Sequence, residues 1–155
     1  MIIINKRNLF FLISVWLLST LLSAQNVTIS TPHTQLLLSV PNGGTPEQLY
    51  YGSRTSDADI RSICETARRR NAYPVYGMGY PCETALSVRH ADGNLTLQMA
   101  VIGVKETRLT KENATLTVIE LKDKVYPFFV NICYKAWQDA DVIETWTEIR
   151  HEEKK

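Results

Sequence analysis

The sequence predicts an all-β protein, an antiparallel β-sandwich with one short helical or irregular excursion. Three observations lead to this fold class. About eight short runs of β-prone residues follow one another, most of them joined by tight turn signals. Several runs alternate apolar and polar residues, as strands with one buried face do. No helical period recurs between the runs, which excludes βαβ units and the dinucleotide sites built on them.

The first 24 residues are predicted to be a secretory signal peptide rather than part of the fold. Lys6 and Arg7 precede an apolar run from Leu9 to Leu22, and Ser23-Ala24 supplies small residues before a cut at Gln25. The alternative is a membrane anchor, but the run is shorter than the roughly 20 apolar residues that a spanning helix needs. We therefore expect a secreted or periplasmic chain, residues 25–155, with no membrane association after cleavage.

The next residues predict a hairpin followed by a helix. Strands are predicted over residues 27–30, 35–40 and 47–51, and Pro41-Asn42-Gly43-Gly44 is the turn between the last two. Ser56, Asp57 and Asp59 predict the cap of a short helix through Ile60, Ile63 and Ala67. Arg68-Arg69-Arg70 is then expected at the C-terminal end of this helix, where it favours the helix dipole. A long irregular excursion from Ser56 to Asn71 is the alternative.

The remaining strands follow a segment that cannot be regular. Tyr73 to Pro81 holds two Pro and two Gly in nine residues, which excludes a helix and a central strand. Five strands are then predicted over residues 85–90, 95–101, 115–121, 128–136 and 142–149. Asp92-Gly93 indicates a hairpin between the first two. The predicted inward residues are Leu95, Leu97, Met99 and Val101 in one strand, and Phe128, Val130, Ile132 and Tyr134 in another.

The three cysteines leave two interpretations open. Cys64, Cys82 and Cys133 have spacings that match no zinc pattern. An oxidising compartment would permit a Cys64–Cys82 disulfide. We favour three small buried side chains, because a chain of this length can form a core without disulfides.

Composition and motifs argue against several functions. With 17 basic and 16 acidic residues and a net charge of +1, the chain lacks the basic excess of a nucleic-acid-binding protein. The acidic pairs Asp57/Asp59 and Asp139/Asp141 fit a helix cap and a turn, and Glu152/Glu153 lies in a charged tail. The histidines, His33, His90 and His151, have no metal-ligand spacing, and Gly77-Met78-Gly79 lacks the Lys-Ser/Thr of a phosphate loop. We therefore assign no catalytic, cofactor-binding or metal-binding residue and expect no cofactor.

The aromatic residues also allow two interpretations. Tyr50, Tyr51, Tyr73, Tyr76 and Tyr80 could form a sugar-stacking platform or could pack within the sandwich. We favour packing. A stand-alone carbohydrate-binding sandwich that uses Trp137, Trp146 or this tyrosine-rich stretch is kept as an alternative function.

Six segments occur in an order that carries a family resemblance. They are residues 29–40, Gln48-Leu-Tyr-Tyr-Gly52, Tyr73-Pro-Val-Tyr-Gly77, Glu83-Thr-Ala-Leu86, His90-Ala-Asp-Gly-Asn94 and residues 137–149. Together they resemble the N-terminal domain of glycoside hydrolase family 36, the α-galactosidases, in a secreted Bacteroides-like form. The resemblance covers Val27 to Lys155. In the family's Tyr-Pro-x-Tyr-Gly-x-Gly-Asp-x-Arg pattern, Tyr80 and Cys82 stand here in place of the Asp and the Arg.

The resemblance implies a large supersandwich domain, longer than this chain and therefore incomplete here at its C-terminal end. Such a domain precedes a (β/α)₈ barrel that carries both catalytic Asp residues, so no catalytic residue can be assigned to this chain. The expected function is that of a non-catalytic fragment of an enzyme that hydrolyses terminal α-galactosides. Its expected partner is the barrel domain, in the same chain or separately encoded. Carbohydrate and a second copy of the chain are further partners that the resemblance leaves open, and substrate-binding residues stay unassigned.

Overall fold

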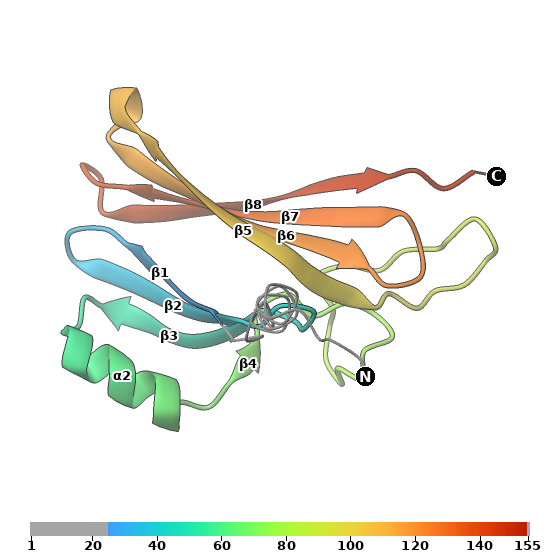
Figure 1. The fold of residues 1–155 in the computed structure, drawn as a ribbon, viewed down its shortest axis with the longest axis horizontal. Coiled ribbons are helices and arrows are strands. Elements are labelled where there is room, and N and C mark those ends of the chain that lie inside the picture. The colour runs from blue at the N-terminus through green and yellow to red at the C-terminus, as the bar shows by residue number, and fades with distance from the viewer. Residues whose placement is uncertain (1–24, 155) are drawn as a thin grey trace, which may run out of the picture.

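The computed structural model describes residues 25–154, and the predicted signal peptide lies outside them. Two four-stranded antiparallel sheets form two layers, with one helix against the outside of the first (Figure 1). The first sheet has the order β1 (Gln25–Ser30), β2 (Thr34–Val40), β3 (Glu47–Ser53) and β4 (Arg70–Asn71). The second has the order β5 (Met99–Leu109), β6 (Ala114–Asp123), β7 (Phe128–Trp137) and β8 (Val142–His151). The predicted antiparallel sandwich is confirmed.

Local sequence explains the first sheet. Thr31 turns the chain between β1 and β2, and its hydroxyl accepts a hydrogen bond from the backbone N–H of Thr34 at 3.0 Å. Gly43, at φ +73°, lets the predicted turn reverse the chain between β2 and β3. The register of β2 on β3 shifts between Leu37 and Leu38, which marks a β-bulge.

The predicted helix is present as α2 (Asp57–Thr66), and its cap is confirmed. The hydroxyl of Ser56 accepts a hydrogen bond from the backbone N–H of Asp59 at 3.3 Å. The predicted position of Arg68 to Arg70 is wrong, because the helix ends at Thr66 and its last turn holds no basic residue. Arg69 instead pairs with Glu47 at 2.9 Å, and Arg70 belongs to β4.

Residues 72–98 connect the two sheets without forming a strand. The predicted strand over residues 85–90 is therefore wrong, and its only pairing is a single parallel bridge between Val75 and Leu86. Leu86, Val88 and His90 are less exposed than the residues between them, so the alternation in the sequence is real. The alternation reflects packing of residues 85–90 against the sandwich, since no strand within residues 25–154 pairs with them.

Strand β5 begins later and ends later than predicted. It starts at Met99 rather than Leu95 and continues to Leu109, past the predicted end at Val101. A register shift at Val101/Gly103 leaves Ile102 without a partner on β6. At this bulge Val101 exchanges two backbone hydrogen bonds with the β2–β3 turn, Gly43 N–H to Val101 O at 2.9 Å and Val101 N–H to Gly44 O at 2.8 Å. These bonds join the two sheets.

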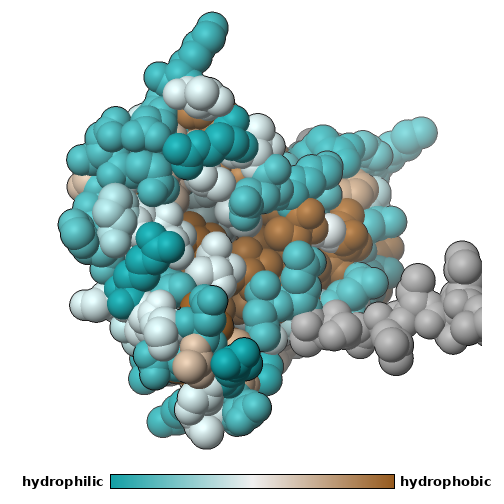
Figure 2. Space-filling model, turned by 60° about the vertical axis from the view of Figure 1, so that its left-hand side comes forward, coloured by the Kyte–Doolittle hydropathy of each residue, from teal (hydrophilic) through white to brown (hydrophobic). Residues whose placement is uncertain are grey.

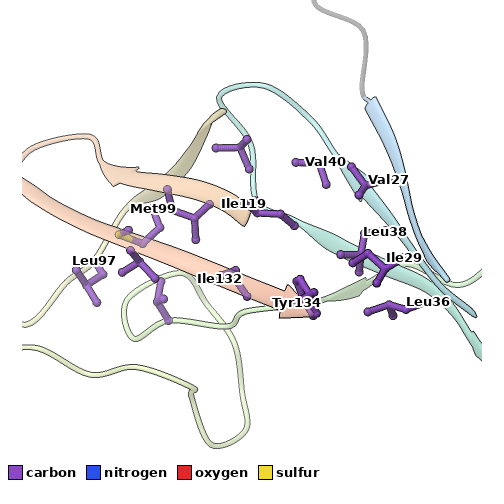
Figure 3. Packing of buried hydrophobic residues seen from close by; sticks show 14 of the residues in the cluster. Val27, Ile29, Leu36, Leu38, Val40, Leu97, Met99, Ile119, Ile132 and Tyr134 are labelled. Atoms are coloured by element: carbon purple, nitrogen blue, oxygen red, sulfur yellow. The ribbon is translucent and has the colours of Figure 1, made fainter. Parts of the chain in front are cut away.

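The core lies between the two layers, as Figure 3 shows for ten labelled residues. The predicted inward row of β7 is confirmed, because Phe128, Val130, Ile132 and Tyr134 are all buried. The first sheet contributes Val27, Ile29, Leu36, Leu38 and Val40, and the connection contributes Val75 and Leu97. One apolar layer therefore serves both sheets.

The cysteines are free, and only one of them is buried. Cys133 is buried on the outward face of β7, whereas Cys64 is half-buried and Cys82 is exposed. The preferred interpretation of three buried cysteines is thus wrong for Cys82, which lies in the irregular connection rather than on a sheet. Burial raises the pKa of the Cys133 thiol, which keeps it protonated and unreactive.

Two leucines that the sequence placed on one strand face should respond differently to truncation. Leu97 is fully buried, whereas Leu95 is 47% exposed. We expect Leu97→Ala to lower the free energy of unfolding by about 2–5 kcal/mol, since it leaves a cavity. Leu95→Ala, the matched control, should cost less than about 1 kcal/mol. Denaturant unfolding of both variants measures the difference, and equal costs would contradict the observed start of β5.

Candidate functional site

A groove of about 500 Å³ opens between the two sheets. On the face shown in Figure 2, apolar residues gather in a central band between hydrophilic margins. The groove is lined by residues of β2, β3, β7 and β8 and the start of the connection, namely Leu36, Gln48, Tyr51, Ala72, Tyr73, Ile132, Tyr134, Ile143, Thr145, Trp146 and Thr147. None of these residues carries a charge at neutral pH. Burial raises the pKa of Tyr134 to about 12, so its phenol also stays neutral.

Both sheets have an open edge beside this groove. Strand β8 ends the second sheet, and β4 ends the first but pairs with β3 only at Glu47 and Gln48. Within residues 25–154, no other strand pairs with the outer edge of β3 or of β8. Unpaired strand edges can accept a further strand. The groove and its two edges therefore suit an apolar polypeptide partner.

The two faces of β8 differ in charge. Thr145 and Thr147 lie opposite Tyr134 and Ile132, so they share the inward face that borders the groove. Glu144 and Glu148 lie opposite Lys135 and Asn131 on the outward face. Trp146 lies opposite Cys133 on that outward face, and its indole N–H donates to Glu148 Oε1 at 3.3 Å.

A second cluster lies at the end of the second sheet, around His90. The His90 side chain is fully buried, and its Nδ1 is 2.8 Å from Glu153 Oε1. Its ring stacks on Tyr126 with a centroid distance of 3.7 Å. The Tyr126 hydroxyl donates to Asp92 Oδ2 at 2.7 Å, which lowers the pKa of Asp92 and raises that of Tyr126. No signal in the sequence connects His90 to Glu153, because 63 positions separate them.

Most of the acidic residues singled out in the sequence have structural partners. Asp59 accepts a hydrogen bond from Ser56, and Asp141 accepts hydrogen bonds from the Thr31 hydroxyl and, at 3.0 Å, the His33 backbone N–H. These two bonds hold the pKa of Asp141 below its ordinary value. Glu152 pairs with Arg150. In the part of the chain that the structure describes, no three His, Cys, Asp or Glu side chains are arranged to hold a metal ion.

The tyrosines are less buried than we expected. Tyr51 is 63% exposed, and Tyr76 and Tyr80 are also exposed, so the packing interpretation is wrong for these three. Tyr50 and Tyr73 are half-buried. Tyr51 and Tyr73 meet in the groove, whereas Tyr76 and Tyr80 belong to the irregular connection. Trp137, half-buried on β7, donates its indole N–H to Glu144 Oε2 at 3.0 Å.

Gly77-Met78-Gly79 packs the connection together instead of forming a phosphate loop. Gly77 has φ +96°, and a Cβ on it would lie 2.5 Å from Thr96 Cγ2 and 2.9 Å from Thr96 Cα. The neighbouring Tyr76 carbonyl accepts a hydrogen bond from the Leu97 N–H at 3.0 Å. The glycine therefore allows the two halves of the connection to approach closely.

Fold and site together define a β-sandwich with an open apolar side, and one comparison shows its family. The family model described as Glycosyl hydrolase family 36 N-terminal domain matches residues 44–155. The chain therefore belongs to the family 36 N-terminal domains, which confirms the expected resemblance. No curated protein matches the chain.

Solved α-galactosidase structures share the fold. The A355E variant of AgaA, a GH36 α-galactosidase of Geobacillus stearothermophilus, matches with a TM-score of 0.72 and 14% identity over 83% of this chain and 22% of its own. The α-galactosidase of Lactobacillus brevis matches with a TM-score of 0.68 and 16% identity over 81% and 21%. The galactosidase domain of AgaSK, an alpha-galactosidase-sucrose kinase, matches with a TM-score of 0.64 and 22% identity over 79% and 21%. The chain thus spans about a fifth of these chains.

The two glycines of the Gly77-Met78-Gly79 motif should differ in their tolerance of alanine. Gly77→Ala forces a Cβ against the Thr96 backbone, whereas a Cβ on Gly79 meets nothing within 4 Å. Gly79 has φ +73°, so Gly79→Ala should cost about 1–2 kcal/mol from backbone strain alone. We expect Gly77→Ala to cost clearly more, because the clash adds to the strain. Denaturant unfolding compares the two, and an equal cost would contradict the close approach to Thr96.

Proposed function

We propose that this chain is the non-catalytic N-terminal β-sandwich of an α-galactosidase-like enzyme whose barrel hydrolyses terminal α-galactosides. The observation that carries the proposal is the family match over residues 44–155. The solved neighbours support it, since they are α-galactosidases of which this chain spans about a fifth. In such an enzyme the sandwich supplies a rigid support, and the reaction takes place in the remaining part.

The groove favours the rest of that enzyme as the partner of this chain. Its lining is neutral and largely apolar, and two unpaired strand edges border it. A polypeptide that adds a strand there would bury Tyr51 and satisfy the backbone groups of β8. Two further partners, carbohydrate and a second copy of the chain, remain predictions.

We expect α-galactosidase activity in the larger protein and none in this chain alone. We expect the purified 155-residue chain to hydrolyse an aryl α-galactoside no faster than a mock preparation. Antibodies against residues 25–155 should precipitate α-galactosidase activity from the producing cells, either with a chain much larger than 17.6 kDa or with a separate barrel chain. Precipitation of residues 25–155 alone, without activity, would contradict the proposal. Saturable binding of galactosides by that chain would instead favour a carbohydrate-binding module.

We also propose that residues 1–24 direct export and that residues 25–155 form the domain. Strand β1 begins at Gln25, so a cut at this position would leave every strand intact. Among residues 25–154, no helix has the length and apolar character needed to cross a membrane.

N-terminal sequencing of the protein from the medium or periplasm tests export. We expect the sequence to begin at Gln25. Replacing Leu17 and Leu18 with Arg interrupts the apolar run and should leave an uncleaved chain in the cytoplasm. An intact Met1 terminus on the exported wild-type protein would contradict cleavage.

A further inference from the structure

The segment after β8 is attached to two turns that lie far away in the sequence. The Glu152 backbone N–H donates to the Pro127 carbonyl at 2.9 Å, in the β6–β7 turn. Both carboxylate oxygens of Glu153 bind the turn at residues 90–94: Oε1 lies 2.8 Å from His90 Nδ1, and Oε2 accepts from the Ala91 N–H at 3.0 Å. One side chain thus holds the segment against the connection.

The His90 ring is fixed from several sides. Tyr126 stacks on it with an interplanar angle of 10°, and Phe128 meets it edge-on at 6.0 Å. The stacked Tyr126 is in turn held by Asp92 and by Asn94, whose side-chain amide donates to the Tyr126 hydroxyl at 3.0 Å. The ring cannot turn toward another partner without separating these contacts.

The other ring nitrogen indicates the protonation state. His90 Nε2 is buried and has no hydrogen-bond partner among the described residues. Because the only ring nitrogen within reach of the Glu153 carboxylate is Nδ1, a ring that donates from Nδ1–H can leave Nε2 as a bare lone pair. Adding a proton at Nε2 would bury an N–H group without an acceptor, which is costly. The geometry therefore favours a proton on Nδ1, directed at the Glu153 carboxylate.

We propose that His90 and Glu153 form an acid-sensitive clasp, which holds the segment after β8 against the 90–94 turn at neutral pH and releases it in acid. Protonation of Glu153 opens the clasp, because the carboxyl group then loses its charge-assisted bonds to His90 Nδ1 and the Ala91 N–H. The inference is independent of the proposed function, since it rests only on contacts within this chain.

The direction of the pH effect follows from Glu153. The Ala91 N–H, and then the His90 bond, hold the pKa of Glu153 below its ordinary value. A carboxyl group with a lowered pKa in the folded state stabilises that state above its ordinary pKa, and the contribution is lost as the pH falls through the lowered value. The other titratable or charged groups around the clasp are Arg89, Asp92, Tyr126, His151, Glu152 and Lys154.

Amide hydrogen exchange at Ala91 in the full-length chain tests the clasp. We expect Glu153→Gln to reduce the protection factor of the Ala91 N–H at pH 7 about tenfold or more, because a neutral amide cannot replace both charge-assisted bonds. Glu152→Gln is the matched control, one position away and exposed, and should leave Ala91 unchanged. In the wild type, Ala91 protection should fall on acidification. Equal protection in the two variants, or protection that rises in acid, would overturn the proposal.

A measurement on the wild type keeps the test independent of variant folding. The ¹⁵N shifts of the His90 ring should show a proton on Nδ1 at pH 7 and should change in the pH step that removes Ala91 protection. A ring that carries its proton on Nε2 alone would overturn the proposal.

Discussion

The two sheets share one apolar layer, and the rest of the structure depends on this constraint. Each sheet has one apolar face, and this face is removed from water only when the other sheet covers it. The chain achieves this with a 27-residue connection, residues 72–98, that forms no strand of its own. Val75 and Leu97 from this connection enter the shared layer. The hydrogen bonds between Val101 and the Gly43-Gly44 turn then fix the position of one layer on the other.

The same constraint explains why one side of the sandwich is open. Two sheets of four strands cover each other only where their inner faces overlap, and β4 is too short to extend the first sheet beside β8. Tyr51 of the first sheet and Thr147 of the second sheet consequently line a groove that neither sheet fills. The acidic residues of β8 lie on its other face, so the open side stays neutral. A neutral opening bounded by unpaired edges is a surface that protein can cover without burying charge.

The sequence predicts the parts of this fold that neighbouring residues determine. It does not predict the parts that depend on contacts between distant residues. The Ser56 cap, the Gly43 turn and the inward row of β7 each follow from a local pattern, and all three are confirmed. Residues 85–90 have the alternation of a strand but no partner strand, and no local pattern can supply one. The exposure of Tyr51 and the pairing of His90 with Glu153 also depend on contacts between remote segments. Local sequence patterns therefore could not predict the groove or the contact between His90 and Glu153.

Four carboxyl groups among the described residues, those of Asp92, Asp123, Asp141 and Glu153, accept hydrogen bonds that hold the fold. Within residues 25–154, each carboxyl with a shifted pKa is shifted downward, and hydrogen bonds cause the shift in Asp92, Asp141 and Glu153. Asp123 is buried, unlike these three, and it accepts hydrogen bonds from the backbone of Gln98, Val125 and Tyr126. A general acid in glycoside hydrolysis needs the opposite, a carboxyl whose pKa is raised so that it is protonated near neutral pH. Asp92, Asp141 and Glu153, whose pKa values are lowered, instead serve as structural anchors among the described residues.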